Sequence, residues 1–100
     1  MTEHDIMRLI EMELSKHGVV MRLNVGSFKT FDGRVISGGL PPGTSDILFI
    51  GNGYVAFIEV KKPGGRISPE QLRFINKMCQ LGHRAGVAYS VDDAMKILGG

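Results

Sequence analysis

The fold is decided by the stretch 46–61, which reads DILFIGNGYVAFIEVK. Two apolar runs, 46–50 and 54–61, flank Gly51-Asn52-Gly53, a sequence typical of a hairpin turn. In the second run both alternating sets of side chains are largely apolar, which favours a strand in the middle of a sheet that is covered on two sides. We therefore expect an antiparallel hairpin at the centre of the fold.

Helices and further strands are predicted on both sides of this hairpin. Helical periodicity indicates a helix over 3–17, followed by a strand over 19–25. After the hairpin, Ser68-Pro69-Glu70-Gln71 has the pattern of a capping box with proline at the first helical position, so a second helix runs from there to Gly82. A strand over 85–90 and a short helix over 90–98 complete the chain. The order is α-β-β-β-α-β-α, an α/β fold with a central mixed sheet flanked by helices, forming a single domain over residues 1–100.

Each of the two long helices has an apolar stripe that we expect to face the sheet. Helical spacing selects the following residues: Ile6, Leu9, Ile10 and Leu14 in the first helix, and Leu72, Ile75, Met78 and Cys79 in the second.

The segment from Gly26 to Ser45 is rich in glycine and proline and is predicted to be a loop. A loop of about twenty residues is unusual in so small a domain, and such loops tend to be functional or disordered. Part of it, around Arg34-Val35-Ile36, could pair as a short strand. The loop carries two basic residues, Lys29 and Arg34.

Charge is distributed unevenly, although the net charge is only +2. The segment 61–84 contains a single acid, Glu70, against Lys61, Lys62, Arg66, Arg73, Lys77 and Arg84. Such a segment could face phosphate groups, or equally form a solvated helix face. The glycines at 64–65 would allow a phosphate group of a ligand to pass close to Lys62 and Arg66.

Composition excludes several other classes. The single cysteine, Cys79, excludes an internal disulfide and a thiolate-rich zinc site. No apolar run approaches the roughly 20 residues that span a bilayer, and the N-terminus lacks a signal-peptide pattern. These features favour a cytoplasmic protein with no membrane partner and no organic cofactor.

The hairpin places two carboxylates close together. If its turn centres near Asn52-Gly53, Asp46 lies opposite Glu59 or one residue away, and directly paired residues have Cβ atoms about 4.5–5.5 Å apart. The two charges repel unless a cation lies between them, and Mg²⁺ or Mn²⁺ prefers such oxygen ligands. Lys61 lies on the same face, two residues beyond Glu59. This is the layout of a metal-dependent hydrolase. The alternative without a catalytic function is an ion pair between Glu59 and Lys61 on the same face of the sheet.

Three ordered motifs resemble the PD-(D/E)XK nuclease superfamily, and within it the VRR-Nuc family. They are Gly43-Thr44-Ser45-Asp46, Glu59-Val60-Lys61 and Ser68-Pro69-Glu70-Gln71. The opening Thr2-Glu3-x-x-Ile6 and the Lys61-x-Pro63-Gly64-Gly65 break are also similar to that family, so the resemblance covers nearly the whole chain. One departure is Ser45, where the family usually has proline.

The resemblance implies roles for individual residues. Asp46 and Glu59 would bind Mg²⁺ or Mn²⁺ together with the carbonyl of Val60. Lys61 would orient or deprotonate the attacking water, or only supply charge. Gln71 would hold the lysine or the phosphate, although a purely structural role in the capping box is about equally supported. An acid of the first helix would complete the site, with Glu3 preferred and Glu11 as the alternative.

We therefore expect a metal-dependent DNA endonuclease that acts on branched DNA, such as four-way junctions, as a homodimer. The expected DNA-binding residues are Lys29, Arg34, Lys62, Arg66 and Arg73. We expect the 26–44 loop, which carries Lys29 and Arg34, to serve dimer contact or recognition of the branch. The alternatives are a flap or nicking nuclease of a larger phage or replication assembly, and a DNA-binding module that has lost activity.

Overall fold

The predicted hairpin lies at the centre of the structure, a computed structural model that describes residues 1–23, 27–37 and 39–99. Strands β4 (Ile47–Ile50) and β5 (Val55–Val60) pair antiparallel. Strand β6 (Arg84–Ala88) pairs parallel with β5, and β1 (Val19–Arg22) pairs antiparallel with β4. The sheet order is β1-β4-β5-β6, so it is mixed and β5 is an interior strand, as predicted.

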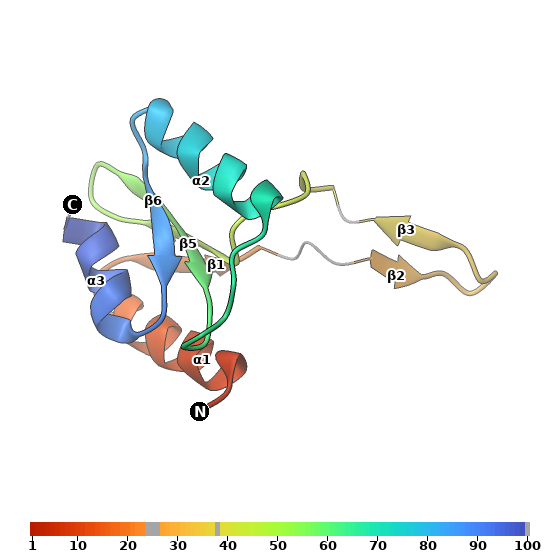
Figure 1. Cartoon of the computed structure of the whole chain (residues 1–100), viewed down its shortest axis with the longest axis horizontal. Helices are drawn as coiled ribbons and strands as arrows, with labels where there is room; N and C mark the ends of the chain where they lie inside the picture. The colour runs from red at the N-terminus through yellow and green to blue at the C-terminus, as the bar shows by residue number, and fades with distance from the viewer. Residues whose placement is uncertain (24–26, 38, 100) are drawn as a thin grey trace.

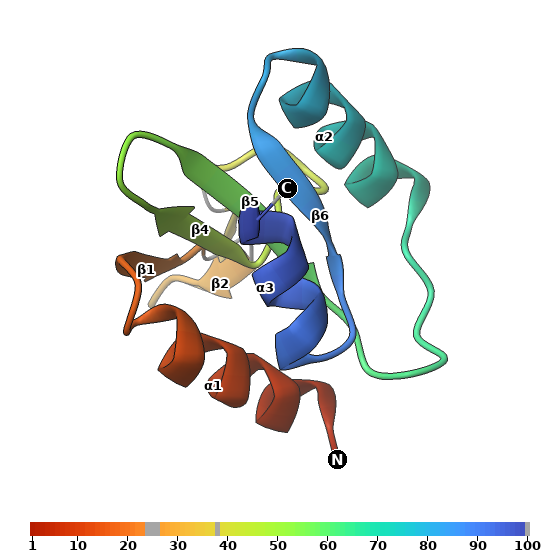
Figure 2. The same cartoon turned by 90° about the vertical axis from the view of Figure 1, so that its left-hand side faces the viewer.

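Three helices cover the two faces of this sheet. Helices α1 (Glu3–Leu14) and α3 (Val91–Gly99) share one face (Figures 1 and 2). Helix α2 (Pro69–Gln80) lies on the other, where Phe74 contacts Phe57 edge-to-face with ring centroids 5.4 Å apart. The main core lies between the sheet and the α1–α3 layer and consists of Ile6, Ile10, Leu14, Ile47, Phe49, Ala56, Ile58, Val60, Ala88, Ala94 and Leu98.

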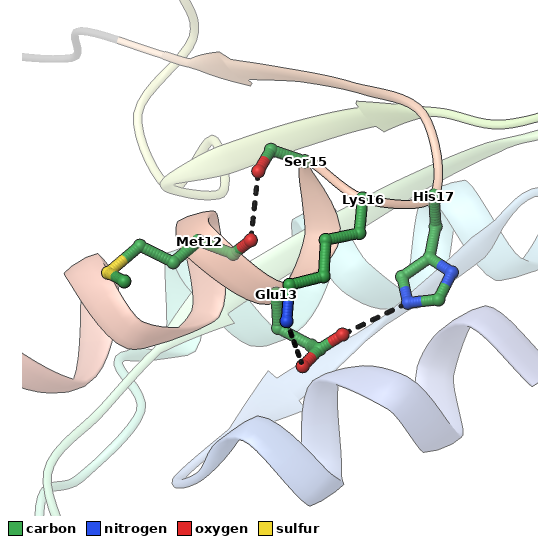
Figure 3. Close-up of polar contacts among 5 residues, drawn as sticks. All are labelled: Met12, Glu13, Ser15, Lys16 and His17. Atoms are coloured by element: carbon green, nitrogen blue, oxygen red, sulfur yellow. Dashed lines mark hydrogen bonds and ion pairs between the residues drawn. The ribbon is translucent and has the colours of Figure 1, made fainter.

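Helix α1 ends at Leu14, three residues earlier than predicted. The residues that follow form a polar turn (Figure 3). The Ser15 hydroxyl donates to the carbonyl of Met12 at 2.8 Å, and Glu13 pairs with Lys16 at 3.4 Å and with His17 at 3.1 Å. Serine competes for backbone carbonyls in this way, which ends the helix before the strand begins.

The segment predicted as a long loop contains a second, two-stranded sheet. Strands β2 (Ser27–Lys29) and β3 (Val35–Ser37) pair antiparallel and project away from the body of the molecule (Figure 1). The expected pairing around residues 34–36 is therefore confirmed. Strand β1 ends at Arg22, and the end of the predicted 19–25 strand, residues 24 and 25, falls outside the described residues.

Helix α2 is less buried than its sequence pattern predicted. Its capping box is formed as expected, with the Ser68 hydroxyl accepting from Gln71 N and the Gln71 side chain accepting from Ser68 N. Ile75 is buried, but Leu72 is 48% exposed and Cys79 is also exposed, so their prediction as core residues was wrong. The reason is that, in the described ranges, the extensive sheet contacts of α2 are with β5 and β6, and a narrow contact needs fewer apolar positions than the sequence offers.

The segment before Asp46 passes very close to the first turn of α2. Gly43 has a positive φ of 85°, and a Cβ at this position would lie 2.4 Å from the carbonyl carbon of Glu70. Only glycine fits both the left-handed conformation and this approach. Gly43 therefore determines how the chain enters the position of Asp46.

We predict that Gly43→Ala destabilises the protein by about 1–3 kcal/mol more than Gly53→Ala does. Gly53 has nearly the same φ, 86°, but nothing lies within 4 Å of its would-be Cβ, so it isolates the cost of the φ angle. Urea unfolding of both variants measures the difference. Equal losses of stability would contradict the tight packing of Gly43 on α2.

Candidate active site

Asp46 and Glu59 meet at the end of the β4–β5 hairpin. The paired residues Ile47 and Ile58 face the main core, so the next pair along the ladder, Asp46 and Glu59, faces α2. The Asp46 carboxylate accepts a hydrogen bond from Val60 N at 2.8 Å, and its backbone carbonyl accepts one from Leu23 N at 2.8 Å. Asp46 is therefore held from both sides, and of the two registers expected from the sequence the structure has the one that places Asp46 directly opposite Glu59.

Glu59 is nearly inaccessible, with 2% of its surface exposed. One carboxylate oxygen, Oε1, accepts a hydrogen bond from the Gln71 side-chain amide. The other oxygen, Oε2, is buried without a hydrogen-bond partner in the described structure. A buried acceptor left in this state costs free energy of about 1–3 kcal/mol.

Gln71 links the helix cap to the carboxylate pair. Its Oε1 accepts from the backbone N–H of Ser68 at 2.8 Å, while its Nε2 donates to Glu59. The capping box therefore fixes the amide so that its donor end points at Glu59. Gln71 therefore serves the capping box and also reaches the site. Its contact at the site is to Glu59 and not to Lys61.

Burial shifts the ionisation of both carboxyl groups. The pKa of Glu59 is raised from 4.5 to about 7, first because the group is buried and second because Asp46 is negatively charged. The pKa of Asp46 is also raised, chiefly by burial, although the hydrogen bond from Val60 opposes the shift. Without a cation the pair therefore holds a proton near neutral pH, as expected of two like charges in contact.

Lys61 lies beside the pair without an ion pair to it. Its positive charge favours the ionised forms of both Asp46 and Glu59, yet in the described ranges no ion pair within 4 Å joins it to either. Its backbone N–H donates to the carbonyl of Ala88 at 3.0 Å, which fixes its position at the end of β5. The ammonium thus remains available to a ligand.

The structure distinguishes Glu3 from Glu11, the two acids of α1 that were candidates for the site. The negative charge of Glu3 contributes to raising the pKa of Asp46, so Glu3 lies within electrostatic reach of the pair. Glu11 instead accepts a hydrogen bond from the guanidinium of Arg22 at 2.8 Å, farther along the helix. Of these two acids, Glu3 is therefore the one whose charge affects the pKa of Asp46.

The residues at this site fit a divalent cation. The orphaned Oε2 of Glu59 and the adjacent Asp46 carboxylate are hard oxygen donors that a cation would satisfy. Because the N–H and C=O of one strand residue point to the same side, the carbonyl of Val60 also faces Asp46. No three His, Cys, Asp or Glu side chains gather as a metal-binding group in the part of the chain described, so the remaining ligands would be carbonyl, water or phosphate oxygens.

The expected DNA-binding residues divide into two groups. Lys62 and Arg66 are exposed in the segment that follows Lys61, and Arg73 is exposed on α2, where it pairs with Glu70 at 3.6 Å. Arg34 lies directly before β3 in the projecting hairpin, where it pairs with Asp32 at 2.9 Å. The side chain of Lys29 falls outside the described residues.

Ser45 is a feature of the site that the sequence did not reveal. It is 1% exposed, and its hydroxyl has no hydrogen-bond partner in the described structure. The only signal in the sequence was its departure from the proline of the resembled family. A buried hydroxyl directly before Asp46 gives the site a second unsatisfied polar atom.

Comparisons with known proteins identify the family and the fold of the chain. The sequence matches the VRR-NUC domain family over residues 1–92, and the chain belongs to this family. A solved structure described as a VRR_NUC domain is similar to it, with 22% sequence identity, coverage of 99% of this chain and 97% of that one, and a TM-score of 0.69. No curated protein matches the sequence. The predicted family and fold class are therefore confirmed, and the chain has a nuclease-type fold.

The ionisation of Glu59 predicts a specific pH dependence of stability in the absence of metal. A carboxyl whose pKa is raised by folding contributes stability that is present below pH 4.5 and is lost as the pH rises to about 7. We therefore expect Glu59→Gln to be more stable than the parent at pH 8, by roughly 2 kcal/mol, and nearly equal to it at pH 4. Thermal unfolding in a chelator across this range measures the effect. An unchanged difference at both pH values would contradict it.

The buried hydroxyl of Ser45 predicts a stabilising substitution. Ser45→Ala removes an unsatisfied polar atom while keeping the backbone, and we expect it to raise the free energy of unfolding by about 1 kcal/mol. The matched control is Ser15→Ala, which removes a hydroxyl that does have a partner and is exposed. Urea unfolding compares the two, and a destabilising Ser45→Ala would indicate that the hydroxyl has an unrecognised partner.

Proposed function

We propose that this chain is a metal-dependent DNA endonuclease whose active site is formed by Asp46, Glu59 and Lys61. The observation that carries the proposal is the pair of carboxylates at the end of β5, one of them with a buried oxygen that lacks a hydrogen-bond partner. Placing two such charges at the margin of a small core is costly unless a cation or ligand uses them. Membership of a family with a nuclease-type fold supports the same reading.

The residues have complementary tasks in this proposal. Asp46, Glu59 and the carbonyl of Val60 bind Mg²⁺ or Mn²⁺, which when bound supplies Lewis-acid stabilisation of the phosphate and activates water. Gln71 holds Glu59 in a fixed orientation through its own anchored amide. Glu3 adds negative charge beside Asp46 and strengthens the attraction for a cation.

Lys61 acts on the phosphate side of the site. Its ammonium has no competing ion pair in the described structure, so it can approach a scissile phosphate and offset charge that develops during hydrolysis. Lys62, Arg66 and Arg73, which are exposed nearby, contribute phosphate contacts that weaken with salt.

The finer proposal is that the substrate is branched DNA and that the enzyme acts as a homodimer. One small domain offers one set of carboxylates, and cutting two strands symmetrically requires two sets related by a two-fold axis. The projecting hairpin, with Arg34 at its turn, is the element we expect to contact the branch or the second subunit. A flap or nicking nuclease within a larger assembly is the alternative substrate class.

We predict that the purified protein cuts DNA only with Mg²⁺ or Mn²⁺ and that Lys61→Ala lowers the rate by about 100-fold or more. The control is Lys16→Ala, because Lys16 lies beyond the end of α1 in the polar turn of Figure 3. Four-way, flap, nicked and linear DNA are compared in one assay. No cutting of any substrate would favour a DNA-binding module without activity, and cutting unaffected by Lys61→Ala would refute the site.

The same assay separates the substrate classes. Preferred cutting of the four-way junction by a dimer supports the resolvase-like reading, whereas preferred cutting of flaps or nicks supports the alternative. Binding measured with Lys61→Ala, which keeps the carboxylates, separates DNA affinity from hydrolysis.

A further inference from the structure

Half of one sheet face is not covered by any helix. Helix α2 packs on β5 and β6, and the described residues show no extensive packing of α2 against β1 or β4. Ile47 and Phe49 face the main core, so Leu48 and Ile50 face the α2 side. Their partners in β1, Met21 and Val19, must share that face, since directly paired residues point to the same side of a sheet.

This uncovered face, which we call the bare half-sheet, consists of Val19, Met21, Leu48 and Ile50. Val19 is 57% exposed, Met21 45% and Ile50 39%, and Leu48 is partly buried. All four are aliphatic or thioether side chains, and no charge interrupts them. A contiguous apolar surface of this kind marks an interaction site for protein more than for DNA, which needs cationic contacts.

The projecting hairpin, β2–β3, also lacks a partner. Within the described ranges, its two strands pack extensively only on each other. An isolated two-stranded hairpin is at best marginally stable in water, so it needs a further surface. Its turn is ordered by the Asp32–Arg34 ion pair at 2.9 Å and by Thr30 N donating to the carbonyl of Arg34 at 2.9 Å, and it presents Phe31 fully to solvent.

We propose that two copies of this chain exchange these surfaces, so that the hairpin of each copy lies over the bare half-sheet of the other. The bare half-sheet and the projecting hairpin belong to the same chain. In a closed dimer with a two-fold axis, each copy would therefore cover the bare half-sheet of the other with its own hairpin. This dimer is the homodimer of the proposed function, and the exchange specifies its interface. Only the role of the dimer in cutting DNA rests on the proposed function.

The exchange would also connect the interface to the active site. The segment after β3 leads through Gly43, packed on α2, directly into Asp46, and Leu23, just after β1, donates to the carbonyl of Asp46. Binding of the hairpin to a second copy would therefore also restrain the chain on each side of the hairpin, next to the carboxylate pair. The two active sites would be held in a constant relation to each other.

The test is the mass of the protein in solution, measured by sedimentation at several concentrations. We expect a dimer for the parent chain, and a dissociation constant at least tenfold higher for Met21→Lys, which places a charge on the bare half-sheet, and for Phe31→Ala, which removes the exposed ring of the arm. Leu81→Lys is the control, because Leu81 is 57% exposed at the far end of α2. Thermal unfolding and circular dichroism verify that each variant is folded.

Each outcome decides the inference. A monomeric parent at all concentrations overturns it, as does a dimer that only Leu81→Lys weakens. A dimer weakened by Met21→Lys but not by Phe31→Ala overturns the exchange of the hairpin. The measurement does not depend on cleavage, so a dimer without nuclease activity would refute the proposed function and leave this interface standing, and an active monomer would do the reverse.

Discussion

The structure depends on one electrostatic constraint, the close approach of the Asp46 and Glu59 carboxylates at the end of an otherwise apolar hairpin. Burial raises the pKa of both groups, and the negative charge of Asp46 raises that of Glu59 further, to about 7. The surrounding structure limits this cost by a small number of hydrogen bonds, from Val60 N to Asp46 and from Gln71 to Glu59. These bonds leave the second carboxylate oxygen of Glu59 without a partner in the described structure. This oxygen is therefore free to bind a ligand.

The rest of the fold can be understood as the support of this pair. Strand β5 lies between β4 and β6, so Glu59 is held on a strand that is paired along both edges. The first turn of α2 brings Gln71 to Glu59, and Gly43 allows the chain to pass within contact of that same turn before it reaches Asp46. Helix α2 therefore positions both carboxylates, although it buries little apolar surface itself.

The small size of the domain explains the surfaces that remain open. A chain of about 100 residues buries only about two-thirds of its unfolded surface, so one helix cannot cover a whole sheet face. Here α2 covers the half of the face that carries the carboxylates and leaves Val19, Met21 and Ile50 exposed. The hairpin β2–β3 projects from the body of the molecule and likewise has no core of its own, since in the described ranges its strands pack extensively only on each other.

The sequence by itself determined the order of the helices and of the four strands of the central sheet, the interior position of β5 and the capping box of α2, and it placed Asp46 within one residue of direct pairing with Glu59. These features follow from local patterns, namely alternation along strands, turn residues and capping residues, which act over a few positions. It overestimated the burial of Leu9, Leu72 and Cys79 and extended the first helix three residues too far. Only the tertiary structure decided that Gln71 contacts Glu59, that Ser45 is buried without a partner, and that half the sheet is bare. Periodicity gives a residue its face, but which neighbour covers that face depends on packing between segments far apart in the chain.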